Sequence, residues 1–302
     1  MTGTPNSVSE DVASTDTDAD VPATKSTVAT EPPDSGSRIE RVVVRELRTV
    51  SRTRTFVVLG AALAAVLVGI AWVGGGVRAG FVPTVVDLLT PLELLVPIVA
   101  VAFGYRAILG DRRRGELDVL DTYPIAPREL VLGVYVGRAV GLLGTVVVPL
   151  LLVGGAVFVG REEPFSRYAS HAGADSPILF ARFVALTALF ALSILAVSLA
   201  ISALVSGTRS ALALSVVALV VLLVGLDLAL VYGFTNGYLA DSSLVHALAV
   251  SPLSAYRGLV FESAVVTASG TGPRTASPVA SLLGLASWTG ASLAVATWAI
   301  QR

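Results

Sequence analysis

Charged side chains inside apolar segments are the first candidates for chemistry in this sequence of 302 residues. Asp227 lies within the apolar segment 211–232, and Arg182 lies at the start of the apolar segment 181–205. An ionisable group in such a segment is costly unless it is paired or lines a polar path. The two residues are therefore candidates to line the route of a transported species. The alternatives are that Asp227 reaches the headgroups or pairs with a neighbouring helix.

Catalytic and metal-binding residue types are scarce. The sequence has no cysteine and only two histidines, His171 and His246, which excludes thiolate chemistry and leaves little for imidazole. The Gly-Ala-Ser sequence ending at Ser292 resembles an intramembrane protease site, but both histidines precede it in expected outer loops and no base is in reach. The phosphate-binding pattern G-x-x-x-x-G-K-[ST] is absent from the sequence, so another polypeptide must bind any ATP. We expect no enzyme activity, no metal site and no cofactor on this chain.

Composition places these residues in a membrane protein. Hydrophobic residues make up 54% of the chain and charged residues 14%, whereas a soluble domain carries about a quarter charged residues. Six apolar stretches approach the roughly 20 residues that a helix needs to cross a bilayer. We expect an all-α, polytopic fold with spans at 55–73, 91–109, 136–159, 181–205, 211–232 and 279–300. The net charge of -1 gives no reason to expect a nucleic-acid partner.

The distribution of arginine predicts the orientation of the spans. With six spans, thirteen arginines fall on the side of the N-terminus and five on the other side. Arginine is enriched in cytoplasmic segments, so both termini are expected in the cytoplasm of a multi-pass plasma-membrane protein. Residues 1–37 are rich in Ser, Thr, Asp and Pro, and we expect a disordered tail there.

The start of the second span carries a capping pattern. Thr90 precedes Pro91 and is followed by Glu93, as at many helix N-termini. The pattern predicts that the helix begins at Pro91, that Glu93 caps it, and that residues 82–89 form a separate short element at the membrane surface.

Residues 38–54 predict an amphipathic helix at the cytoplasmic interface, before the six-span part at 55–302. Its apolar side consists of Ile39, Val43, Leu47 and Val50. Its opposite side consists of Arg41, Arg45, Arg48 and Arg52. Such a helix lies in the headgroup layer, with its arginines toward anionic lipid or a cytosolic subunit.

The loop 104–129 joins the second and third spans and is too charged to be buried. Pro124 is expected to end a short helix within it, and Pro127 to begin the next helix. A short helix that ends at a proline and is held by two spans would act as a lever for motion in the cytosol.

This loop resembles the first cytoplasmic loop of ABC-2 type permeases, which shows G-[TE]-L and then P-[IV]-x-x-[RE]-x-[LI]. The matching residues are Gly115, Glu116, Leu117, Leu120, Pro124, Ile125, Arg128 and Leu130. Residues 251–257, SPLSAYR, are similar to the N-P-x-x-x-[FY]-R element of NosY-like permeases in that family, with Ser251 in the place of Asn.

The resemblance implies a permease subunit of an exporter that works as a homodimer or heterodimer with a separate ATPase. In the family the first cytoplasmic loop docks in a groove of the ATPase. Carried onto this sequence, that role falls on Gly115, Glu116, Leu117, Leu120, Pro124 and Arg128. A secondary transporter, or an ABC-2-like subunit that relays motion without passing substrate, remains an alternative.

Two further patterns concern packing. Gly133, Gly137 and Gly141 repeat every four residues, which predicts close approach of another helix, from this chain or from a second subunit. The outer loop 233–278 contains an apolar stretch in which Arg257 makes insertion costly. We expect re-entrant or surface helices there, not a seventh span.

Overall fold

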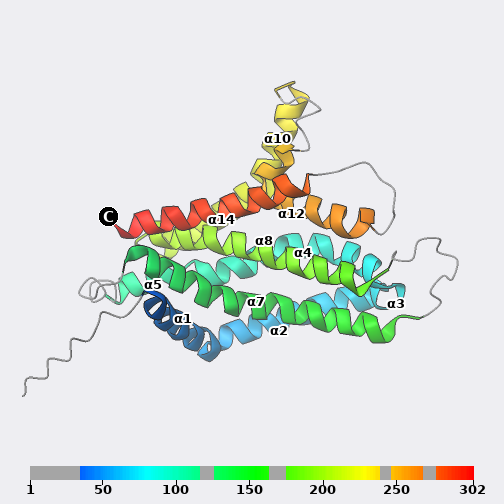
Figure 1. Cartoon of the computed structure of the whole chain (residues 1–302), viewed down its shortest axis with the longest axis horizontal. Coiled ribbons are helices and arrows are strands. Elements are labelled where there is room, and N and C mark those ends of the chain that lie inside the picture. The colour runs from blue at the N-terminus through cyan, green and yellow to red at the C-terminus, as the bar shows by residue number, and fades with distance from the viewer. Residues whose placement is uncertain (1–34, 116–125, 163–174, 239–245, 268–276) are drawn as a thin grey trace, which may run out of the picture. The chain divides into compact units, whose positions relative to one another are not determined.

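The computed structural model describes residues 35–115, 126–162, 175–238, 246–267 and 277–302, and within these ranges all regular structure is helical (Figure 1). The helices of the first half are α1 (Ser35–Arg52), α2 (Arg54–Val73), α3 (Gly76–Ala79), α4 (Phe81–Gly104), α5 (Ala107–Arg113) and α7 (Pro127–Gly160). Those of the second half are α8 (Pro177–Leu204), α9 (Thr208–Val220), η1 (Val221–Gly225), α10 (Leu226–Thr235), η2 (Leu248–Val250), α12 (Pro252–Val260), η3 (Phe261–Val266) and α14 (Pro278–Ile300).

Six helical segments in the described ranges are long and apolar enough to cross a membrane. They are Arg54–Val73, Phe81–Arg113, Pro127–Gly160, Pro177–Leu204, Thr208–Thr235 and Pro278–Ile300. The expected all-α fold with six spans is therefore confirmed, and the chain is a multi-pass membrane protein.

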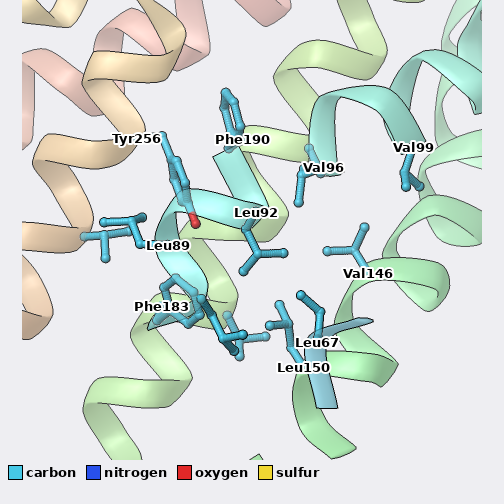
Figure 2. Close-up of a cluster of buried hydrophobic side chains, with 14 of the residues drawn as sticks. Leu67, Leu89, Leu92, Val96, Val99, Val146, Leu150, Phe183, Phe190 and Tyr256 are labelled. Atoms are coloured by element: carbon cyan, nitrogen blue, oxygen red, sulfur yellow. The ribbon is translucent and has the colours of Figure 1, made fainter. Parts of the chain in front are cut away.

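The core of the bundle is centred on α8, the most deeply buried span, which packs against α4, α7, α12 and α14. Figure 2 shows its middle, where Leu89 and Leu92 of α4 meet Phe183 and Phe190 of α8 and Tyr256 of α12. Lipid tails are as apolar as these side chains, so van der Waals packing holds such a bundle together.

The second span begins ten residues earlier than the capping pattern predicts. α4 starts at Phe81, with Pro91 inside the helix, so the prediction of a separate surface element at 82–89 is wrong. Four side chains of that stretch are buried. The true start is capped from a distant loop, because Asp175 Oδ1 accepts the Val82 N–H at 2.9 Å. Proline inside the helix is tolerated since the neighbouring helices stabilise it.

The fifth span, Thr208–Thr235, is the least buried of the six. It consists of α9, the π-helical turn η1 and α10, and α10 projects from the other helices in Figure 1. Its described side chains are mostly exposed and apolar, as in Val217, Val220 and Leu228. This span has the fewest internal contacts to hold it in one position.

Residues 246–267 form short helices that break at Ser251 and are not among the six candidate spans. Ser251 caps α12, since its Oγ accepts the Ser254 N–H at 3.3 Å, and Pro252 takes the first helical position. α12 packs against α14 and α8, with Tyr256 and Leu259 buried.

Candidate functional site

The glycines spaced by four residues on α7 lie against α1 of the same chain. Gly133, Gly137 and Gly141 face Val42, Glu46 and Val50, respectively, and an added methyl group at each would overlap these side chains. Both series advance in the same direction, so α1 and α7 run parallel in close contact. The structure thus places this glycine surface in an intramolecular contact.

We expect Gly137→Ala to force α1 away from α7, because its new methyl group would overlap the Glu46 side chain. Overpacking of this kind costs about 1–3 kcal/mol. The measurement is thermal unfolding of the detergent-purified protein, together with protease cleavage within α1. Gly144→Ala is the matched control, since an added methyl group there meets nothing within 4 Å. Equal behaviour of the two variants would contradict the close packing of α1 on α7.

α1 has the expected helical form, but its most buried side differs from the expected apolar side. Val42, Glu46 and Val50 are buried, whereas Ile39 and Leu47 are half-buried. The reason is that the glycines of α7 have no side chains, so the side of α1 that carries Glu46 packs closely against them. Of the four arginines named above, the side chains Arg41, Arg48 and Arg52 are exposed, and Arg45 is half-buried in an ion-pair network.

This network, which we call the α5 junction, consists of Arg45, Glu46, Asp111, Arg114 and Arg138. Glu46 Oε2 accepts the Arg138 Nε–H at 2.7 Å, and Glu46 Oε1 lies 3.2 Å from Arg45 Nη2. Asp111 receives Arg45 at 2.7 Å and Arg114 at 2.6 Å. Glu46 and Asp111 are both 3% exposed. Two buried carboxylates thus join α1, α5 and α7.

α5 is also fixed to the end of α8. Ser202 Oγ accepts the N–H groups of Ile108 and Leu109 at 3.1 and 3.0 Å, and so caps the first turn of α5. Arg112 donates to the carbonyl of Ala203 at 2.9 Å, at the last turn of α8. α5 cannot swivel without moving α8 and α1.

Of the residues assigned to ATPase coupling, the structure describes Gly115 and Arg128. Gly115 ends α5 with a positive φ of 70°, its N–H donating to the Arg112 carbonyl at 3.2 Å. Arg128 is exposed in the first turn of α7, which begins at Pro127 as expected. The others lie outside the described residues: Glu116, Leu117, Leu120 and Pro124.

A second polar cluster joins α4, α10 and α12 within the bundle. Glu93 Oε1 accepts the Arg257 Nε–H at 2.7 Å, and Glu93 Oε2 receives Nη2 of the same guanidinium at 2.5 Å. Ser254 Oγ donates to Asp227 Oδ1 at 2.8 Å. The hydrogen bonding of Arg257 to the Glu93 carboxylate raises the pKa of Arg257, so the guanidinium stays charged. The prediction that Glu93 caps its own helix is wrong, because its partner lies on α12.

The two residues proposed to line a path have different partners. Arg182 donates to the carbonyl of Ser263 at 3.4 Å, and Asp227 accepts from Ser254. Asp227 thus contacts a neighbouring helix, α12, as in one of the alternatives for it.

Sequence reasoning missed the pairs that do form. Glu46, Glu93 and Arg257 were visible as charges in or beside apolar stretches, but nothing in the sequence named their partners. The SPLSAYR element is now explained: Ser251 caps, Tyr256 stacks on Phe190 with ring centroids 4.7 Å apart, and Arg257 binds Glu93. Serine can replace asparagine at its first position because both are good caps.

The chain is similar to known transporter proteins. A family model described as "ABC-2 family transporter protein" matches residues 7–302. The chain is 31% identical over 270 residues to the "Probable ABC transporter permease protein NosY" of Pseudomonas aeruginosa, covering 85% of this chain and 96% of that protein. It is also 31% identical over 107 residues to the protein of the same name from Stutzerimonas stutzeri, covering 34% of this chain and 39% of that protein.

Proposed function

Because the chain belongs to the ABC-2 transporter family and is thus an ABC transporter membrane subunit, we propose that it is the permease of an exporter. A separate ATPase supplies the energy, since the sequence holds no Walker A pattern. That ATPase docks on the loop 104–129. Two copies of this chain, or this chain and a second permease, form the translocating unit in the plasma membrane.

The observation that carries the docking proposal is the α5 junction at the base of the loop. A docking site transmits force only if it is rigidly attached to the spans. α5 follows α4 directly, binds α8 through Ser202 and Arg112, and binds α1 through Asp111. The loop ends in α7, and Arg138 of α7 forms an ion pair with Glu46 of α1. A force applied to the loop is therefore transmitted to four helices, α1, α4, α7 and α8.

The bias of arginine supports an orientation with this end in the cytoplasm, where an ATPase is found. The exposed arginines of α1, Arg41, Arg48 and Arg52, would then lie at the height of the headgroups. They would contact anionic lipid or the ATPase.

We expect Leu117→Arg to weaken ATPase docking without loss of membrane insertion. A leucine that fills an apolar pocket of the partner contributes about 2 kcal/mol when it is a central contact, which corresponds to roughly 30-fold in affinity. The measurement is binding of the purified ATPase to the permease in detergent, and the permease-dependent change in its hydrolysis rate.

Leu117→Ile is the control for this change, because it keeps the apolar volume and should bind as the unaltered chain does. Equal binding by the arginine variant would contradict docking at this loop. Transport that needs no ATPase would instead favour a secondary transporter.

A further inference from the structure

We propose that α12 mechanically couples α4 to the fifth span, and that Glu93, Arg257, Ser254 and Asp227 are the positioning residues of this coupling. The proposal rests on the proposed function, because the ATPase provides the motion. It adds a specific route by which that motion reaches the half of the bundle remote from α5.

The short helix α12 binds carboxylates from two spans. Arg257 donates two hydrogen bonds to Glu93 of α4, and Ser254 donates one to Asp227 of α10. Ser254 and Arg257 are three residues apart, so they share one side of α12. A two-point contact between guanidinium and carboxylate fixes orientation as well as distance. α12 cannot turn without moving both partners.

The coupling has to act over the distance between α5 and α12, and α8 measures this distance because it contacts both helices. Ser202 near the end of α8 binds α5, and Thr187 in its first half forms a hydrogen bond with the Tyr256 hydroxyl of α12 at 2.9 Å. Fifteen residues of helix separate them, or about 22 Å at 1.5 Å per residue. α4 covers the same distance and connects directly to α5. It is the element that can carry motion from the α5 junction to α12.

α4, the fifth span and α12 each depart locally from α-helical geometry beside the polar contacts that join them. Pro91 and Pro97 flank Glu93 in α4, and each removes one N–H from the helical hydrogen bonds, which permits bending there. The π-helical turn η1 ends just before Asp227, and η3 starts just after α12. Such turns are common where helices change shape.

The fifth span is free enough to move when α12 moves. It is the least buried span, whereas α12 itself is anchored by the buried Tyr256 ring against Phe190. Bending of α4 at Glu93 would therefore turn α12, and the Ser254–Asp227 contact would displace α10. Motion that starts at α5 would therefore change the position of the fifth span.

The test uses the absence of cysteine, which allows two introduced cysteines to be labelled selectively. Spin labels at Leu228 of α10 and Leu152 of α7, both exposed, report the position of the fifth span. The distance between them is measured in the complex with the ATPase, with and without ATP. The complex of the unaltered chain should show an ATP-dependent shift. Arg257→Gln should abolish the shift while permease-dependent ATP hydrolysis persists.

Two further variants guard against misfolding and non-specific effects. Ser254→Ala removes a single hydrogen bond and leaves the Glu93–Arg257 pair intact, so it should fold normally and still lose the shift. Arg78→Gln is the control, because Arg78 is an exposed arginine of α3 whose ion pair, with the exposed Glu162 at 3.7 Å, involves none of the coupling residues, and it should retain the shift.

The outcomes separate this proposal from the proposed function. Suppose that ATP hydrolysis responds to the permease, but that the label at Leu228 moves as far in the Arg257→Gln and Ser254→Ala variants as in the unaltered chain. Coupling through α12 is then overturned. If hydrolysis responds but the labels never move, it is overturned too. If hydrolysis does not respond to the permease at all, the proposed function fails, and the coupling fails with it.

Discussion

Replacement of Glu46 by alanine is expected to destabilise the contact between α1 and α7 by about 3–5 kcal/mol, because it leaves a largely buried cation without its carboxylate. The side chains of Glu46 and Arg138 are 4% and 13% exposed and are joined at 2.7 Å. The Arg138 guanidinium also lies 6.0 Å from the centre of the Phe56 ring of α2.

Thermal unfolding and protease cleavage within α1 measure this effect. Glu40→Ala is the matched control, since Glu40 is an exposed carboxylate of the same helix and its loss should change stability by no more than about 0.5 kcal/mol. Because Glu46 also contacts Arg45, the variant should loosen the α5 junction and weaken ATPase stimulation. A Glu46→Ala protein as stable as Glu40→Ala would show that the buried pair does not hold α1.

Tyr256→Ala should be comparably severe, with a loss of about 3–5 kcal/mol. Tyr256 is fully buried, its ring is stacked on Phe190, and its hydroxyl is bonded to Thr187. Lipid cannot fill the space inside the bundle, so the missing ring leaves a cavity whose lining loses its van der Waals contacts. α12 would lose its anchor, and the Glu93–Arg257 pair with it.

Tyr256→Phe separates the ring from the hydroxyl. It keeps the stacking and removes one hydrogen bond, which leaves a loss of about 1 kcal/mol. Thermal unfolding in detergent measures both variants, and Tyr238→Ala, at a side chain 78% exposed, gives the baseline for an exposed tyrosine. If alanine and phenylalanine at position 256 prove equally mild, the α12 anchor lies elsewhere.

The structure changes the role of the charges in the apolar part of the chain. The sequence predicts that Glu93 caps its own helix and that Asp227 lines a path, reaches the headgroups or pairs with a neighbouring helix; in the structure both are bound to α12. The basic side of α1 likewise contains a residue, Arg45, that bridges two buried carboxylates. These charges organise helices, and the coupling proposal depends on that arrangement.

The class of the protein follows from its sequence alone. Six apolar stretches of the right length predicted six spans, the 3.6-residue periodicity of 38–54 predicted α1, and Pro127 predicted the start of α7. The resemblance of the loop 104–129 predicted the ABC-2 family. These features are local: a bilayer imposes a length, and a helix imposes a period, whatever the rest of the chain does.

Which polar groups meet, in contrast, depends on how the helices pack. Glu93 and Arg257 are 164 residues apart, Glu46 and Arg138 are 92 apart, and the cap of α4 comes from Asp175, 93 residues after Val82. A charge placed in an apolar helix must find a partner, but the sequence does not show which helices will be neighbours. Helix packing makes that choice, through close contacts such as Gly137 on Glu46, and the partners follow from it.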